Sequence, residues 1–235
     1  MSSHIWRYID LAKLIHLAAN RTLHFTRIDQ FKDKFEGSYP IGNLKDWEYK
    51  YPGVGDFSGW RKFACVSCWY ESENESAAMW ELYSRSGQGM AIRSTKDKLK
   101  ESLLFAGEVF FSNVKYIDFL KDKADIKTPL EVFLYKRIEF ASEREFRAAL
   151  FDQPGCEGFK DGFPNLGSVE KQEGFPKNGK DMPVEPEVLI EKVILSPYSK
   201  PWYKEMVKDV LGKYNLSSLG LLDSELTADP VYPKQ

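Results

Sequence analysis

The segment from Glu143 to Phe151 constrains the fold of this chain most, because charged and apolar side chains alternate along it. Its sequence is Glu-Arg-Glu-Phe-Arg-Ala-Ala-Leu-Phe. Successive side chains of an extended strand point to opposite faces. A strand over residues 143–151 therefore puts two carboxylates and a guanidinium, those of Glu143, Glu145 and Arg147, on one face. Apolar side chains occupy the other face, toward a core. The charged row forms either a structural ion-pair ladder or a functional site.

Short apolar runs typical of strands alternate along the chain with amphipathic segments typical of helices. Strands are predicted at residues 5–9, 22–28, 62–69, 90–94, 143–151, 193–196 and near 218–222, with one or two more within 107–117. Helices are predicted at residues 11–19, 76–84, 96–104, 129–140 and 201–214, with a short one near 44–51. Asp10 suits the N-cap of the first of these helices, and Pro201 suits the start of the last. Met79 and Trp80 have the helical spacing of core residues. This order predicts the α+β class, as a single domain with a mixed or antiparallel central sheet flanked by helices.

The length of 235 residues suits one large domain or two small ones. No internal repeat and no linker with a matching shift in composition divides the chain. We expect one domain over residues 1–222 and a polar C-terminal tail over residues 223–235. Within that domain, residues 152–186 are rich in Gly, Pro, Lys and Asp, which predicts an extended, mobile insertion.

The composition argues against several classes of protein. A net charge of −2 is unlike the basic domains of electrostatically driven nucleic-acid binders, although it leaves room for a local basic groove. No apolar run approaches the roughly 20 residues that span a bilayer, and the N-terminus lacks the apolar region of a signal peptide. Three cysteines are too few for a disulfide scaffold. We expect a reduced, cytoplasmic protein without a membrane partner; its oligomeric state cannot be read from the sequence.

Two groups of residues could suggest a metal. Cys65 and Cys68 form a Cys-x-x-Cys motif, but a strand points residues three apart to opposite faces, so they cannot share one ion. Asp29, Asp33 and Glu36 lie close together in a predicted loop without the spacing of a calcium site. A solvated loop that caps helix ends is the favoured interpretation, and no metal is expected.

Several short stretches, in a fixed order over most of the chain, carry a family resemblance. They are Trp6–Tyr8, Leu23–Arg27, Asp29–Gly37, Ser67–Trp69, Glu75–Tyr83, Gly89–Ile92, Lys136-Arg137, Glu143–Arg147 and Val193–Pro197. Together they resemble a bacterial family known as domain of unknown function 2971. That family name implies no activity.

A second resemblance implies an activity. Arg7 on a first strand, Ser67 on a later strand and Glu143-Arg-Glu145 beyond it resemble the ADP-ribosyltransferases of the Arg–Ser–Glu type. Where that family has Ser-Thr-Ser, this chain has Val66-Ser67-Cys68. The resemblance implies NAD⁺ as a co-substrate, a protein or nucleic-acid acceptor, and a role as a toxin or phage-defence effector.

The chemistry of such a transferase gives the candidate residues their roles. Glu145 and Glu143 are the candidate catalytic residues: one carboxylate stabilises the positive charge that develops on the ribose, and the other orients or deprotonates the acceptor. The guanidinium of Arg7 suits a pyrophosphate. An aromatic ring, from Trp6, Tyr8 or Phe25, could stack on nicotinamide.

Ser67 and His24 complete the candidate cofactor-binding residues, which also include Arg7 and Tyr8. Each has a plainer alternative. A serine in an apolar strand is commonly a small, hydrogen-bonded core residue, and a single histidine is commonly hydrogen-bonded in the core or at the surface. Arg7 could equally be a surface cation in a cross-strand ion pair.

Two other functions stay open. In the first, the protein is a non-enzymatic interaction or sensor domain of a bacterial defence system, and Glu143, Glu145, Arg147 and Arg7 form a buried structural network. In the second, a nuclease or related phosphodiester enzyme uses a metal held by residues among Asp29, Asp33 and Glu36. An open cleft over Glu145 favours the transferase, whereas a Glu145 sealed against Arg147 favours the structural network.

Overall fold

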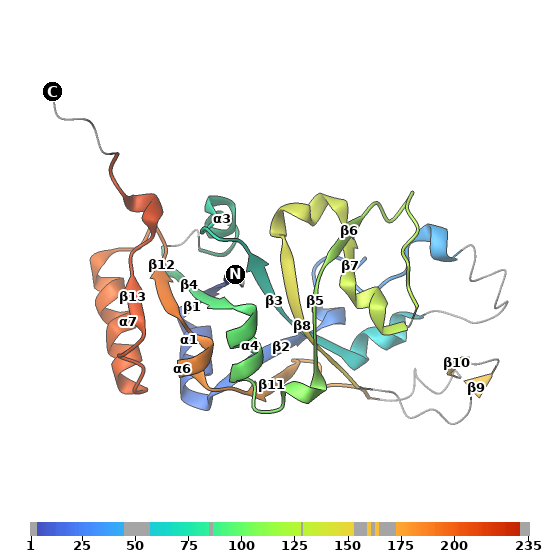
Figure 1. Ribbon diagram of the computed structural model, residues 1–235, viewed down its shortest axis with the longest axis horizontal. Coiled ribbons are helices and arrows are strands. Elements are labelled where there is room, and N and C mark those ends of the chain that lie inside the picture. Colours follow the sequence, from blue (N-terminus) through green and yellow to red (C-terminus); the bar gives the residue numbers. More distant parts are fainter. Residues whose placement is uncertain are drawn as a thin grey trace. The chain divides into compact units, whose positions relative to one another are not determined.

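The computed structural model describes residues 4–44, 57–84, 87–127, 129–152, 159–160, 163–164 and 173–230 (Figure 1). The helices and a mixed, mostly antiparallel sheet confirm the predicted α+β class. None of the described helices is both long and apolar enough to cross a membrane. Residues 45–51 of the predicted short helix and residues 153–158, 161–162 and 165–172 of the predicted insertion lie outside the described residues.

The chain groups into two compact units, and each unit combines separate stretches of sequence. The first contains residues 1–23, 69–106 and 182–235, and the second contains residues 24–68 and 107–181. The strands β2 (Thr22–Arg27), β3 (Ala64–Glu71) and β11 (Lys180–Pro183) contribute residues to both. The single domain over residues 1–222 stays a prediction.

The strands of the first unit are ordered around its N-terminal strand. β1 (His4–Asp10) pairs antiparallel with β4 (Gly89–Thr95) along its whole length and with the end of β3. β12 (Lys192–Leu195) pairs antiparallel with β4, and β13 (Gly220–Leu222) pairs parallel with β12. The short strands near residues 193–196 and 218–222 are therefore confirmed.

Helices α1 (Leu11–Asn20) and α3 (Ala77–Ser84) pack on β1, and α4 (Lys96–Ser102) packs on β4 (Figure 1). The unit also contains α6 (Pro186–Leu189), α7 (Pro201–Lys213) and the 3₁₀ helix η6 (Glu225–Thr227). The predicted cap of α1 is confirmed, because the Asp10 carboxylate accepts a hydrogen bond of 2.8 Å from the Lys13 amide. Pro201 starts α7, as predicted, at a position that needs no amide donor.

The core of the first unit is aromatic. Buried side chains from β1, α3, β4 and β12 pack together, namely Trp6, Tyr8, Met79, Trp80, Ala91 and Ile194. Met79 and Trp80 therefore belong to a core, as their helical spacing predicted.

The second unit places β8 (Glu145–Phe151) between β3 and β5 (Val109–Asn113). β8 is antiparallel to β5, with Arg147 opposite Ser112. β2 pairs antiparallel with β3 and also pairs with β11. Two small sheets complete the unit: β6 (Lys115–Ile117) with β7 (Tyr135–Arg137), and β9 (Phe159–Lys160) with β10 (Phe163–Pro164).

Short 3₁₀ helices connect these strands. They are η1 (Ile28–Gln30), η2 (Phe57–Phe63), η4 (Pro129–Leu134) and η5 (Ile138–Glu143), while η3 (Ala106–Glu108) spans the boundary between the two units. The predicted continuous helix over 129–140 is therefore wrong, because β7 interrupts it. The parallel pairing of β7 with β6 overrides the helical spacing of the apolar residues, and Ile138 is left 48% exposed.

The predicted strand at 143–151 begins two residues later than expected. Glu143 ends η5, and Arg144 has a left-handed backbone with φ of 38°. Glu143 thus lies in a turn that directly precedes the strand. Phe146, Ala148 and Leu150 are buried, as their alternation predicted. Glu145 and Arg147, on the other face, are also buried, so both faces of β8 are covered.

Candidate functional site

A buried network of ion pairs surrounds Arg147 in the second unit. The guanidinium donates from Nε to Glu145 Oε1 at 2.8 Å and from Nη2 to Glu145 Oε2 at 3.0 Å. Nη2 also donates to Glu36 Oε2 at 2.8 Å, and Nη1 donates to the carbonyl of Phe133 at 2.6 Å. Arg147 is fully buried and Glu36 is 1% exposed, so each charge is compensated by buried protein groups.

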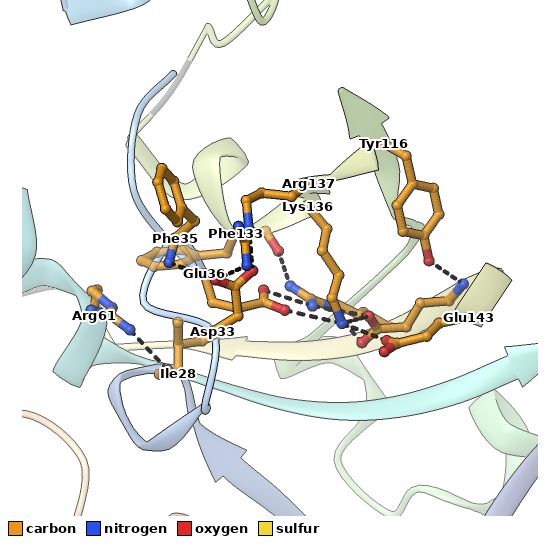
Figure 2. A network of polar contacts seen from close by, with 12 residues as sticks. Ile28, Asp33, Phe35, Glu36, Arg61, Tyr116, Phe133, Lys136, Arg137 and Glu143 are labelled. Atoms are coloured by element: carbon orange, nitrogen blue, oxygen red, sulfur yellow. Dashed lines mark hydrogen bonds and ion pairs between the residues drawn. The ribbon is translucent and has the colours of Figure 1, made fainter. Parts of the chain in front are cut away.

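Lys136, on β7, joins the same network from another strand. Its Nζ lies 3.2 Å from Glu36 Oε1, 2.5 Å from Glu143 Oε2 and 3.2 Å from Glu145 Oε2. Figure 2 shows the Lys136 side chain directed toward Glu143. One ammonium therefore brings together carboxylates from the loop after β2, from the turn before β8 and from β8 itself.

Three of the stretches that carry the family resemblance meet in this network. Asp29–Gly37 supplies Glu36, Lys136-Arg137 supplies the ammonium, and Glu143–Arg147 supplies the remaining charges. A second link connects the first two stretches, because Arg137 Nε donates to Asp33 Oδ2 at 3.0 Å and Nη2 lies 3.0 Å from Asp33 Oδ1 (Figure 2). The separate charged motifs of the sequence thus form one structural element.

The network fixes the charge state of its buried members. Burial alone would raise the pKa of Glu145, but attraction to Arg147, hydrogen bonds from it and attraction to Lys136 outweigh burial and lower the pKa to about 2. Burial opposes the charge of Arg147, yet the nearby Glu145 and Glu36 raise the pKa of its guanidinium further above the usual value. Glu145 is therefore a permanent carboxylate at any physiological pH.

Two more side chains contact Glu145. The Tyr116 hydroxyl, from β6, accepts a hydrogen bond of 2.8 Å from the Glu145 amide (Figure 2). The Cys68 thiol is hydrogen-bonded to the carboxylate, and burial raises its pKa well above the usual value, so it stays protonated and can donate. Burial likewise raises the pKa of Tyr116 to about 12. One neutral donor, the Cys68 thiol, thus supplements the two cations around this carboxylate.

The two carboxylates of the Glu-x-Glu motif differ in accessibility. The Glu145 side chain is 5% exposed, whereas that of Glu143 is 19% exposed. Glu145 is sealed against Arg147, as the structural-network alternative predicted. The turn that ends at Arg144 carries Glu143 out of the strand, which makes it the more accessible of the pair.

The predicted solvated loop at Asp29, Asp33 and Glu36 is wrong for its buried members. Glu36 is buried against Arg147 and Lys136, and the Asp33 side chain is only 8% exposed beside Arg137. Asp29 pairs with Arg27 at 2.7 Å. Each carboxylate thus meets a cation, and no group of three or more His, Cys, Asp and Glu side chains in the described parts of the chain could hold a metal ion.

The two thiols of the Cys-x-x-Cys motif have different surroundings. Cys68 contacts Glu145, whereas Cys65 lies near Arg27 and receives a backbone interaction from Lys180. Burial raises the pKa of the Cys65 thiol to about 12. Both thiols are therefore protonated.

The predicted cofactor-binding residues divide between the two units. Arg7 and Tyr8 lie on β1 of the first unit, where the Arg7 guanidinium lies 5.8 Å from the centre of the Trp69 ring. Tyr8 is 7% exposed, and its hydroxyl accepts a hydrogen bond of 2.9 Å from the Ser76 amide. Burial raises the pKa of Tyr8 above its ordinary range. Tyr8 is thus an integral part of the core of the first unit.

Ser67 and His24 belong to the second unit. Ser67 is fully buried on β3, as its plainer alternative predicted. His24 lies on β2, with its Nδ1 2.7 Å from Asp181 Oδ1. The other two rings suggested for nicotinamide, Trp6 and Phe25, are buried core residues at 4% and 0% exposure. Roles of these residues in NAD⁺ binding stay predictions.

Sequence reasoning missed Lys136 as a member of the site and assigned Glu36 to solvent. One signal could have identified both residues. Glu36 and Lys136 lie in stretches that carry the family resemblance, Asp29–Gly37 and Lys136-Arg137. Gly37 has φ of 73°, and a Cβ there would lie 2.7 Å from a Phe133 ring carbon. The close packing of this loop on Phe133 is what brings Glu36 to Arg147.

The chain was compared with protein-family models, curated proteins and solved structures, and only solved structures match it. No protein-family model and no curated protein matches the chain, so the resemblance to domain of unknown function 2971 is not confirmed. The complex of Thermus sp. 2.9 DarT with NAD⁺ matches with a TM-score of 0.47 and 10% identity, over 96% of this chain and 97% of that chain. The complex with ADP-ribosylated ssDNA matches with a TM-score of 0.44 and 10% identity, over 95% and 94% of the two chains. The complex with carba-NAD⁺ matches with a TM-score of 0.41 and 11% identity, over 95% and 96%. All three TM-scores are low, so we infer function from the residues of this chain.

Proposed function

We propose that this chain is an NAD⁺-dependent ADP-ribosyltransferase-like enzyme whose catalytic carboxylates are Glu143 and Glu145. In this reaction the bond between the ribose C1′ and the nicotinamide nitrogen breaks, and nicotinamide leaves as a neutral molecule with the bonding electron pair. A nucleophilic oxygen or nitrogen of the acceptor forms the new bond to C1′ and loses its proton. Positive charge develops on the ribose in between, and a fixed carboxylate stabilises it.

The accessible carboxylate of Glu143 is the observation that carries this proposal, because Glu145 is sealed against Arg147. The Glu143 side chain is 19% exposed, and Lys136 Nζ lies 2.5 Å from its Oε2. Behind it, Arg147 and Lys136 hold the Glu145 carboxylate in place and lower its pKa to about 2. A carboxylate that is already oriented and ionised costs no reorganisation when positive charge develops near it. The same low pKa makes Glu145 unsuited to take up a proton, so proton transfer is not its role.

The difference in exposure supports a division of roles. Glu143 has the more accessible side chain, at 19% against 5% for Glu145. We assign contact with the ribose or the acceptor to Glu143, and the fixed negative charge behind it to Glu145. The order of Arg7, Ser67 and the two glutamates along the chain resembles that of the Arg–Ser–Glu enzymes and further supports the proposal.

A second candidate function has its own support. Each Glu145 oxygen accepts from Arg147, and Oε2 also contacts Lys136, in a residue only 4% exposed. A buried carboxylate whose two oxygens both contact cations is typical of a structural network. The alternative is a non-enzymatic interaction or sensor domain in which the charges maintain the fold.

The test is incubation of the purified full chain with NAD⁺ labelled in its adenylate phosphate. Parallel reactions contain a cell protein extract, single-stranded DNA or RNA, and one contains no acceptor. Wild type is expected to release nicotinamide and to transfer label to one class of acceptor. Glu143→Gln is expected to lose roughly 100-fold or more of the rate, the cost of removing one aimed electrostatic group.

Glu205→Gln is the matched control. Its side chain is 68% exposed on α7 and lies far in sequence from the network, so its rate should equal that of wild type. Circular dichroism and thermal unfolding establish that each variant is folded. Wild type that is folded yet consumes no NAD⁺ in any reaction would reject the transferase in favour of the non-enzymatic alternative.

A further inference from the structure

We propose that Lys136 is a positioning residue that holds Glu143 and Glu145 in their working orientation, an inference that rests on the proposed transferase function. It extends that function to a residue that the Arg–Ser–Glu order does not contain. Lys136 would act through the two carboxylates, without contacting the substrate.

The contacts of the Lys136 ammonium support a role in orientation. Nζ lies 2.5 Å from Glu143 Oε2 and 3.2 Å from both Glu145 Oε2 and Glu36 Oε1. An ammonium has three N–H donors, and here it meets three carboxylates. The Phe140 ring covers a further side, with its centre 5.0 Å from Nζ. The donors of Lys136 are thus committed to the protein.

Glu143 depends on Lys136 more than Glu145 does. Arg147 contacts Glu145 and Glu36 directly. Among the residues that the structure describes, the ion pair of Glu143 is the one with Lys136. Glu143 sits in a turn beside the left-handed Arg144, where the backbone alone leaves several side-chain rotamers open. The ammonium fixes one of them.

The balance of charges in the network is a second reason to assign Lys136 a positioning role. Glu36, Glu143 and Glu145 carry three formal negative charges against the two positive charges of Lys136 and Arg147. Without Lys136, three carboxylates would share a single buried cation. Mutual repulsion would then favour protonation of one of them and would turn the others apart. Lys136 thereby keeps both glutamates of the motif charged and close together.

An arginine cannot replace this lysine in full. A guanidinium presents its donors in one plane, whereas the ammonium directs its donors toward carboxylates that approach from three elements. Lys136→Arg therefore keeps the positive charge but changes the orientation of Glu143. Lys136→Met removes the charge and keeps most of the volume. The two variants separate the contribution of charge from that of geometry.

The experiment measures kcat, the KM for NAD⁺ and the pH–rate profile of the full chain. Lys136→Met is expected to lower kcat roughly 10- to 100-fold with little change in KM. It should also move the acid limb of the profile to higher pH by about one unit or more, because a carboxylate loses its cation. Lys136→Arg should lower kcat while the acid limb stays in place.

Lys115→Met is the matched control. Lys115 is a nearby cation on β6 whose Nζ lies 3.4 Å from the Tyr135 hydroxyl. It should leave kcat and the acid limb unchanged. A purely structural role of Lys136 would lower the active fraction equally at every pH and leave the acid limb unmoved.

The outcomes distinguish this inference from the proposed function. Suppose that wild type is active and that Lys136→Met folds and has the kcat and pH profile of wild type. This result would overturn the positioning role of Lys136. If Lys136→Met does not fold, Lys136→Arg decides, and wild-type kcat in that variant would overturn the inference. No turnover by wild type would reject the transferase and, with it, any positioning role for catalysis. NMR titration of Glu145 in wild type and Lys136→Arg would then report whether the network itself is correct.

Discussion

Arg147 and Glu36 form a buried ion pair of 2.8 Å although 111 residues separate them in the sequence. The ion pair connects the loop after β2, which contains Glu36, with β8, which contains Arg147. The side chains of Arg147 and Glu36 are 0% and 1% exposed, so both charges are removed from bulk solvent. The two charges therefore depend on each other.

The first prediction concerns this pair. Arg147→Met and Glu36→Gln should each lower the free energy of unfolding by roughly 3–5 kcal/mol, because each leaves a buried partner without its charge. The loss of unfolding free energy in the double variant should be smaller, by at least about 1 kcal/mol, than the sum of the losses in the two single variants. The reason is that the interaction between the two side chains is lost only once. Urea unfolding of the four proteins measures the coupling. Strict additivity would mean that the two residues do not interact in solution.

The second prediction concerns acid stability. Because the folded-state pKa of Glu145, about 2, lies below its ordinary value of 4.5, its contribution to stability is present in full above pH 4.5. That contribution declines as pH falls from 4.5 toward 2 and amounts to roughly 3 kcal/mol by linkage. The difference in unfolding free energy between wild type and Glu145→Gln should therefore shrink over this interval. A difference that stays constant from pH 6 to pH 3 would contradict the low pKa.

The third prediction uses two glycines. Gly37→Ala should lower the free energy of unfolding by roughly 1–3 kcal/mol, because Gly37 has φ of 73° and its Cβ would meet a Phe133 ring carbon at 2.7 Å. Gly107→Ala is the control, since a Cβ there meets nothing within 4 Å. Thermal unfolding compares them. Equal melting temperatures for the two variants would show that the loop does not pack on Phe133.

The fourth prediction concerns the C-terminal segment of the first unit. Glu75 accepts hydrogen bonds from the Ser224 hydroxyl at 2.6 Å, the Glu225 amide at 2.6 Å and the Trp80 indole at 2.7 Å. Glu75→Ala removes a charged acceptor, worth roughly 2 kcal/mol or more over these bonds. The chain should then be cleaved near Ser224 at least about 10-fold faster by a protease acting on the native protein.

Glu73→Ala serves as its control. Glu73 is close in sequence but has a 65% exposed side chain and pairs with His4. Its cleavage rate should equal that of wild type, because an exposed ion pair contributes little to stability. Faster cleavage in both variants would point to a general loosening around β3 instead of a specific anchor at Glu75.

Local patterns in the sequence predicted most elements of the fold. Asp10 at the start of α1 and Pro201 at the start of α7 were identified because capping depends on neighbouring residues alone. The buried apolar face of β8 followed from simple alternation. The helix predicted over 129–140 was wrong, because its spacing fits a helix while its environment provides a strand partner, β6.

The candidate site, too, was predicted only where it depends on residues that are close together in the sequence. The sequence identified the Glu-x-Glu motif and proposed Arg147 as a partner of Glu145, because those residues are neighbours on one strand face. It could not show that Glu143 lies in a turn, since this depends on the left-handed backbone of Arg144.

By itself, then, the sequence determined the α+β class, the starts of α1 and α7, the apolar face of β8 and the charged residues around which a site could form. These properties depend on side chains a few positions apart, whose relative directions follow from helix or strand geometry. Only the tertiary structure decided that Glu36 and Lys136 belong with Glu145 and Arg147. Which distant charges become partners depends on how loops and strands pack, and a buried charge is stable only where that packing supplies its counter-charge.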